Sequence, residues 1–107
     1  MLIKSYMKKV YISGKITGIE KEAPALFEKA EQEVRAMGFE PVNPMKLNHE
    51  HDLKWSSYMR VDLRELSYCD AVYMMSNYQD SKGAKGELDT AILLQLDVMF
   101  QHRNVKV

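Results

Sequence analysis

Apolar and polar positions follow one another in blocks along the chain, and the blocks predict strands and helices in turn. Four short runs of β-branched, aromatic or other apolar side chains are typical of strands, at residues 8–13, 39–43, 71–75 and 98–100. The third run is apolar throughout, as expected of a strand buried on both faces of a parallel sheet. Two prolines in or beside the second run indicate an edge strand. Residues 105–107 are expected to continue the last strand.

Between these runs, three segments repeat apolar side chains at spacings of three and four residues, which predicts amphipathic helices. The first has Pro24 in its first turn and ends at Gly38, the second spans residues 55–68, and the third follows Gly83. Residues 45–54 are polar and irregular. The predicted buried faces are Phe27, Ala30, Val34 and Met37 in the first helix, Met59, Leu63 and Leu66 in the second, and Ala84, Leu88, Ala91, Ile92 and Gln95 in the third.

Strands that alternate with helices favour an α/β fold with right-handed crossovers. We expect one mostly parallel sheet of four or five strands, covered by helices. Ligands of such sheets bind beyond the carboxyl ends of the strands, at the switch point. The loops at residues 13–18 and 76–83 are therefore the places where a ligand site is expected.

Composition narrows the class of protein. The chain has 107 residues, which predicts one domain over residues 1–107, and 46% hydrophobic with 28% charged residues fits a folded domain. Fifteen basic and fifteen acidic residues argue against binding to a nucleic acid polymer. No apolar run could span a bilayer, no signal peptide is evident, and the single Cys69 excludes a disulfide framework. A cytoplasmic protein without membrane contact is the resulting expectation.

Residues 11–18, with the sequence YISGKITG, form the first candidate site. Glycines allow close backbone approach to a ligand, and hydroxyls can donate and accept hydrogen bonds. The spacing fits neither a dinucleotide-binding fingerprint nor a Walker A loop. A tight turn between strand and helix explains the same pattern.

The second candidate site surrounds Glu87. Ser81 and Gly83 are expected just before the third helix, whose N-terminal amides favour anions. Glu87 borders the apolar stripe and can face inward, where an ionised carboxylate could attack a sugar carbon. The alternative is that Glu87 simply suits the first turn of a helix.

The third candidate is Asp62, four residues from both Tyr58 and Leu66 on the second helix. Burial there would raise its pKa, and a carboxyl with a raised pKa can act as a general acid. The alternative is a boundary residue that caps the helix or pairs with Arg60 or Arg64.

Three further features are interpreted as structural. Asp70 is expected to hold a loop N–H, and Cys69 to be a small buried hydrophobic residue. The run His49-Glu50-His51-Asp52 has ligand types suited to a metal, but no distant ligand completes the set. A solvated loop is the favoured interpretation of this run.

Seven short motifs follow one another along the chain: VYISG at 10–14, ITG at 16–18, VNP at 42–44, Asp62-Leu63, CDAV at 69–72, SKGA at 81–84 and Glu87-Leu88. As an ordered set they resemble the nucleoside 2-deoxyribosyltransferase superfamily, and most of all its short uncharacterised branch in bacteria and phages. The resemblance covers about residues 8–100, so residues 1–6 are expected to be an N-terminal extension.

The resemblance implies a three-layer flavodoxin-like or Rossmann-like fold and cleavage of an N-glycosidic bond. By analogy with the transferases and the related deoxynucleoside 5′-monophosphate N-hydrolases, Glu87 would attack the anomeric carbon, Tyr11 would hydrogen-bond to Glu87, and Asp62 would handle the leaving base. No cofactor and no metal is implied, and the partner is a small nucleoside or nucleotide. The implied substrate-binding residues are Ser13, Gly14, Lys15, Ser81 and Gly83, with Ser81 on the sugar or phosphate side.

Three departures from the family pattern concern the substrate. Lys15 stands where this branch often has proline and the N-hydrolases have a serine that contacts phosphate. Thr17 replaces an arginine of those hydrolases. Residues 101–107 do not match the C-terminal region with which the transferases complete a neighbouring subunit's pocket.

Three hypotheses for function follow. The chain is an enzyme that acts on nucleosides or their monophosphates, a nucleotide-binding module without chemistry, or an oligomeric scaffold. So short a chain leaves little to roof a pocket, so we expect a homodimer or higher homo-oligomer in which a second copy supplies the roof.

Overall fold

The computed structural model describes residues 7–102, in which four strands form one parallel sheet. The strands are β1 (Lys9–Ser13), β2 (Glu40–Val42), β3 (Ala71–Met74) and β4 (Asp97–Phe100), and they pair in the order β2-β1-β3-β4. Tyr11 of β1 lies opposite Val42 on one side and Val72 on the other. This order confirms the predicted flavodoxin-like α/β class, and it confirms the second strand as an edge strand.

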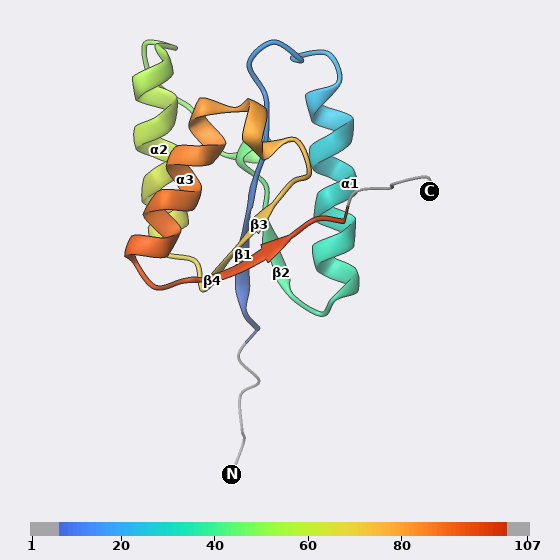
Figure 1. Cartoon of the computed structure of the whole chain (residues 1–107). Helices are drawn as coiled ribbons and strands as arrows, with labels where there is room; N and C mark the ends of the chain where they lie inside the picture. The colour runs from blue at the N-terminus through green and yellow to red at the C-terminus, as the bar shows by residue number, and fades with distance from the viewer. Residues whose placement is uncertain (1–6, 103–107) are drawn as a thin grey trace.

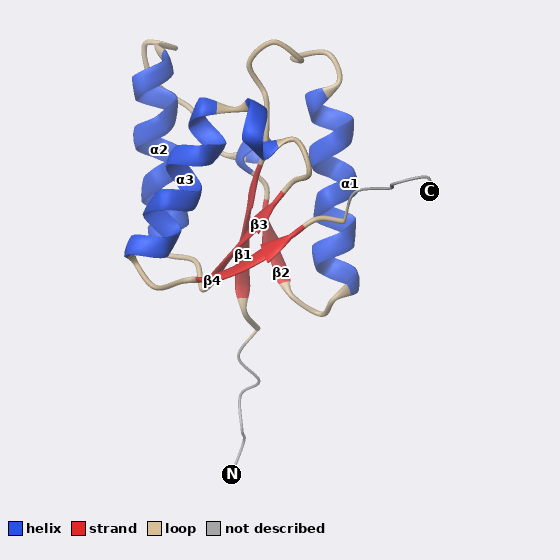
Figure 2. Ribbon diagram, in the orientation of Figure 1, coloured by secondary structure: helices blue, strands red, loops and turns tan. Residues whose placement is uncertain are grey.

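Helices cover both faces of the sheet and give the fold three layers. α1 (Ala23–Ala36) lies on one face, whereas α2 (Trp55–Ser67) and α3 (Lys82–Leu93) lie together on the other (Figures 1 and 2). Short 3₁₀ helices at Pro44–Lys46 and Tyr78–Asp80 follow β2 and β3. No helix within residues 7–102 is both long and apolar enough to cross a membrane.

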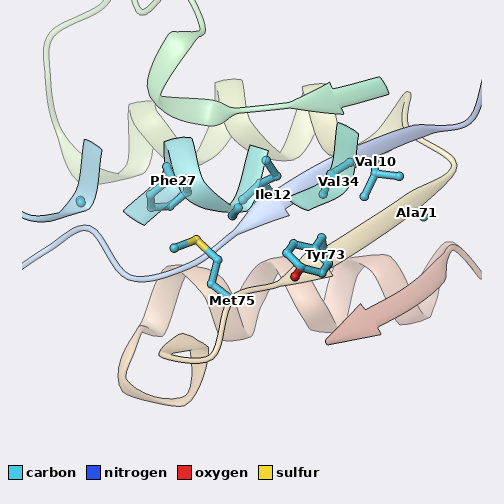
Figure 3. Close-up of a cluster of buried hydrophobic side chains, with 9 residues drawn as sticks. Val10, Ile12, Phe27, Val34, Ala71, Tyr73 and Met75 are labelled. Atoms are coloured by element: carbon cyan, nitrogen blue, oxygen red, sulfur yellow. The ribbon is translucent and has the colours of Figure 1, made fainter. Parts of the chain in front are cut away.

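The two faces of the sheet build two separate cores because side chains alternate along a strand. Val10 and Ile12 of β1 pack toward α1 with Phe27, Val34 and Tyr73 (Figure 3). Tyr11 packs on the other face in a cluster with Val72, Met74 and Leu66, and Ala84 and Ala91 of α3 complete that cluster. Ser13 shares the face of Tyr11, so β1 presents two hydroxyl groups toward α3.

Several predicted core positions are wrong. Met37 lies just past the end of α1 and is 44% exposed, and Ile92 of α3 is 59% exposed. At about 100° per residue, Ile92 lies about 80° from Ala84 on one side of α3, and Glu87 lies about 60° from Ala84 on the other. The buried face of α3 is therefore turned toward Glu87 and away from Ile92.

The ends of the chain elements differ from the predicted bounds as well. Gln95 lies beyond the end of α3 with a φ of 59° and is exposed, so it is not part of the buried face of that helix. The predicted continuation of the last strand at residues 105–107 lies outside the described residues.

The predicted buried face of α2 is only partly confirmed. Leu66 is fully buried, whereas Met59 and Leu63 are partly exposed.

Candidate active site

A cavity of about 910 Å³ opens at the carboxyl ends of β1 and β3, where the sequence places it. Its walls come from the loop after β1, the 3₁₀ helix at Pro44–Lys46, the first two turns of α2 and the start of α3. In Figure 1 these segments lie at the upper end of the sheet. The volume is within the range of small-molecule sites.

Glu87 lies at the base of this cavity and is 5% exposed. It is the sixth residue of α3, past the first turn, so the interpretation as a first-turn residue is wrong. The Tyr11 hydroxyl donates a short hydrogen bond to Glu87 Oε2, and Ser13 Oγ donates to Oε1 at 2.7 Å. The carboxyl group is therefore held on both oxygens by side chains from β1.

Burial governs the ionisation of this group. Desolvation raises the pKa of Glu87 to about 7, the two hydroxyl donors oppose that rise, and the nearby Asp62 adds to it. Burial and the neighbouring Glu87 and Asp62 also raise the pKa of Tyr11 well above its ordinary value. Tyr11 thus stays a hydroxyl donor at any physiological pH.

Asp62 also lines the cavity and is 8% exposed. Desolvation raises the pKa of Asp62 to about 6, and His49 opposes the rise. The nitrogen His49 Nε2 lies 3.5 Å from Asp62 Oδ1, and within residues 7–102 Asp62 forms no ion pair with Arg60 or Arg64. Burial thus brings the pKa values of both carboxyls toward neutrality, and each group affects the ionisation of the other.

The structure divides the five predicted substrate-binding residues into two groups. Gly14, Lys15, Ser81 and Gly83 line the cavity. Ser13 is fully buried with its hydroxyl on Glu87, and it does not line the cavity.

The residues that line the cavity have structural roles as well. Ser81 is the N-cap of α3, and its Oγ accepts from Ala84 N at 3.1 Å. Gly83 lies inside the first turn of α3, not before the helix as expected. Gly14 packs so closely on Met75 that an added Cβ would lie 2.9 Å from Met75 Cβ. The backbone of Lys15 donates to Asn77 Oδ1 at 3.0 Å, which joins the loops after β1 and β3.

Sequence reasoning missed much of the cavity wall. Trp55, Tyr58 and Met59 lie with Asp62 on one face of α2, and their spacing of three, one and three residues could have indicated this. His49 had no such signal. Its side chain is only 15% exposed and packs on Tyr58, so the solvated-loop interpretation is wrong for this residue.

The structure confirms the structural interpretation of Cys69 and, in part, that of Asp70. Asp70 accepts from Lys9 N at 2.8 Å, so it holds a backbone N–H as expected, but that N–H lies at the start of β1 and not in a loop. Cys69 is buried, and desolvation raises the pKa of its thiol to about 12. No group of three or more histidine, cysteine, aspartate or glutamate side chains within residues 7–102 is arranged to hold a metal ion.

Comparison with known proteins places the chain in a family. Residues 8–100 match the model of a family described as a domain of unknown function, DUF4406. The chain belongs to this family. No protein of curated function matches this DUF4406 chain.

Two solved structures share the fold of this DUF4406 protein. A 2-deoxyribosyltransferase from Bacillus psychrosaccharolyticus, described as a biocatalyst for nucleoside synthesis, is 21% identical with a TM-score of 0.65, over 92% of this chain and 77% of that one. A 2-deoxyribosyltransferase from Leishmania mexicana is 15% identical with a TM-score of 0.65, over 87% of this chain and 63% of that one. At these identities the likeness shows a common fold.

Proposed function

We propose that this DUF4406 protein cleaves the N-glycosidic bond of nucleosides or their 5′-monophosphates through a glycosyl-enzyme intermediate. The observation that carries the proposal is the buried Glu87, fixed by two hydroxyl donors at the base of a cavity that it shares with Asp62. The activity named for the two transferases that share the fold supports sugar chemistry at this edge of the sheet. The proposal places the chain in the nucleoside 2-deoxyribosyltransferase superfamily, near the N-hydrolases.

In the first step, a carboxylate oxygen of Glu87 attacks the anomeric carbon of the sugar. The bond between that carbon and the base nitrogen breaks, and Asp62 gives its proton to the base. In the second step, water or a new base attacks the same carbon, Asp62 accepts the proton of the incoming group, and Glu87 leaves as a carboxylate. Water gives hydrolysis and a base gives transfer.

These roles require the charge on Glu87 and the proton on Asp62. Tyr11 and Ser13 donate to Glu87 and stabilise its charge, whereas Asp62 Oδ1 has no hydrogen-bond partner in the described part of the chain. With these donors in place the pKa of Glu87, about 7, is still above that of Asp62, about 6, so without substrate the proton lies more on Glu87. The proposed reaction proceeds from the other form, with an ionised nucleophile and a protonated acid, and the donors on Glu87 reduce the cost of reaching it.

The cavity wall also fits a flat base and a sugar. Trp55, Tyr58 and Met59 offer aromatic and apolar surface on one side. Lys15 and Lys82 line the cavity too, and the Lys82 ammonium lies 4.9 Å from the Trp55 ring centroid. A 5′-phosphate would find its counter-charge at these lysines.

The test is a panel of deoxynucleosides, ribonucleosides and their 5′-monophosphates, with chromatography for free base. Wild type is expected to release base, and Glu87→Gln is not. Asp89→Asn, on the exposed side of α3, is the matched control and should retain activity. A second free base in the mixture separates transfer from hydrolysis. Release of base by Glu87→Gln at the wild-type rate would refute the nucleophile.

The same panel tests the phosphate. Lys15→Ala is expected to raise KM for a monophosphate and to leave KM for the matching nucleoside unchanged. An equal effect on both substrates would show that Lys15 does not hold a phosphate. If no substrate releases base but ligands raise the melting temperature, the protein is a binding module.

A second copy over the cavity is part of the proposal. Trp55 and Tyr58 line the cavity and are 48% and 37% exposed, and Leu53, in the loop just before α2, is 66% exposed. Exposed apolar side chains of this kind are typical of an interface. Light scattering at assay concentration should show a dimer or larger assembly, and an active monomer would contradict it.

A further inference from the structure

Two histidines in the loop between β2 and α2 form a chain of ring-to-ring contacts that the proposed reaction does not use. His49 Nδ1 lies 3.0 Å from His51 Nε2, and His51 Nδ1 accepts from the backbone N–H of Leu53 at 3.0 Å. Both rings pack on Tyr58 of α2, with centroid distances of 4.8 Å for His49 and 4.5 Å for His51. The three rings hold the loop against the cavity wall.

The hydrogen bond from the Leu53 amide to His51 determines which imidazole nitrogens carry protons. A backbone amide is only a donor, so His51 Nδ1 carries no proton and the neutral ring has its proton on Nε2. His51 Nε2 then donates to His49 Nδ1, which must be an acceptor. The proton of His49 is therefore on Nε2, the nitrogen nearest to Asp62.

The backbone at Leu53 supports this order. Leu53 has a φ of 62°, in the left-handed region, although its side chain is 66% exposed and gains little from burial there. Such a conformation costs about 1–2 kcal/mol for a residue with a side chain. It aims the Leu53 amide back at His51, and this hydrogen bond offsets part of the cost.

Two acceptors lie near the proton on His49 Nε2. The Pro44 carbonyl oxygen lies 3.4 Å from His49 Nε2, and Asp62 Oδ1 lies 3.5 Å from it. Asp62 Oδ1 is buried, and it is a polar side-chain atom in residues 7–102 without a hydrogen-bond partner. A buried acceptor without a donor is costly, so a small shift of the ring toward Asp62 is favourable.

We propose that His51 and His49 are positioning residues for Asp62: Leu53 fixes the tautomer of His51, His51 fixes that of His49, and His49 Nε2 donates to Asp62 Oδ1. Asp62 then keeps its own proton on Oδ2, the oxygen that the cavity can reach. The proposal rests on the proposed function for its catalytic meaning, since it assigns the aim of the general acid. The tautomers themselves do not depend on any activity.

Several titratable or charged groups lie around Asp62 and the two histidines, and a change in their charge would perturb the hydrogen bonds between these three residues. Asp62 faces Glu87 from α3, Tyr11 from β1 and His49 from the loop. His51 faces Asp52, which Arg60 of α2 also influences. A second proton on either ring would put two donors against each other, so the chain requires both imidazoles to be neutral.

The first experiment reads the tautomers directly by ¹⁵N NMR of the imidazole rings at neutral pH. We expect the Nε2–H form for both His49 and His51. In His51→Phe, which retains the aromatic contact with Tyr58, His49 should become a mixture of tautomers. His51→Gln can accept from Leu53 N and donate to His49, so it should restore the Nε2–H form. An Nδ1–H form of His49 in the wild type would overturn the proposal.

The second experiment follows the Asp62 carboxyl carbon by ¹³C NMR as a function of pH. A donor on the charged form stabilises it, so His51→Phe should move the titration midpoint upward by about half a pH unit or more, and His51→Gln should not. His102→Gln, at an exposed position, is the matched control. Equal midpoints in wild type and His51→Phe would overturn the proposal, whether or not the protein turns over any substrate.

If wild type releases base, the same variants give the catalytic readout. His51→Phe is expected to lower kcat about tenfold and to shift the alkaline limb of the pH profile upward, with recovery in His51→Gln. A loss in both variants with unshifted limbs would show a merely structural role and refute the positioning role. Absence of base release by the wild type would refute the proposed function, and the two NMR measurements would still decide the histidine chain.

Discussion

Replacement of Glu87 by glutamine is expected to stabilise the folded protein at neutral and alkaline pH while it removes activity. Glu87 is 5% exposed, and burial raises its pKa from 4.5 to about 7. A carboxyl whose folded pKa is raised contributes stability that is fully present below the unfolded pKa. That contribution is lost as pH rises through the folded value.

The magnitude follows from the two pKa values. Each pKa unit corresponds to about 1.4 kcal/mol, so ionisation of Glu87 in the folded state costs about 3 kcal/mol above pH 7. Glutamine has nearly the same shape and no charge, and Tyr11 and Ser13 can still hydrogen-bond to its amide. This cost therefore disappears in Glu87→Gln.

The assay is urea unfolding of both proteins at pH 4 and pH 8. The free energy of unfolding of Glu87→Gln relative to wild type should increase by about 3 kcal/mol between these values. For a typical small domain this corresponds to about 1–3 M in the urea midpoint at pH 8. Glu40→Gln, at an exposed position in β2, is the matched control and should show little change. An equal difference at both pH values, or a smaller one at pH 8, would refute the reasoning.

Three further predictions follow from the same geometry. If the protein turns over a nucleoside, its kcat/KM should be bell-shaped in pH with limbs near the values of about 6 and about 7 that burial gives to Asp62 and Glu87, and a profile flat from pH 5 to 8 would contradict their coupling. Tyr11→Phe should lower kcat by about 10- to 100-fold with the fold retained by circular dichroism, because Glu87 loses a donor, whereas unchanged kcat would remove Tyr11 from the mechanism. Gly14→Ala should destabilise the fold by about 1–3 kcal/mol in urea unfolding, since the new Cβ would overlap Met75. Gly86→Ala in α3 meets no atom within 4 Å and should stabilise it by about 0.5–1 kcal/mol, so equal effects of the two alanines would contradict the packing at Gly14.

The local pattern of the chain determined its elements and their order. A run of apolar residues at 71–75 suffices to predict a buried strand, because burial on both faces demands apolar side chains at every position. Alternation of such runs with helical stripes then leaves few topologies other than a parallel sheet. The edge of the sheet that carries the cavity follows from topology alone, whereas Glu87 and Asp62 were singled out by their positions beside the helical stripes and by the motifs.

Only the tertiary structure decided what those carboxyls contact. The rotation of α3 about its axis, which buries Glu87 and exposes Ile92, depends on packing against β1. The helical repeat in the sequence defines the buried face of α3 only to within about one residue. The two hydroxyl donors of Glu87 come from a strand more than seventy residues away. His49 reaches Asp62 through an irregular loop without any periodic signal, and a buried oxygen without a donor becomes visible only when every neighbour is in place. Sequence patterns report which side chains avoid water, whereas hydrogen-bond partners and pKa values depend on distances between segments that the chain brings together only on folding.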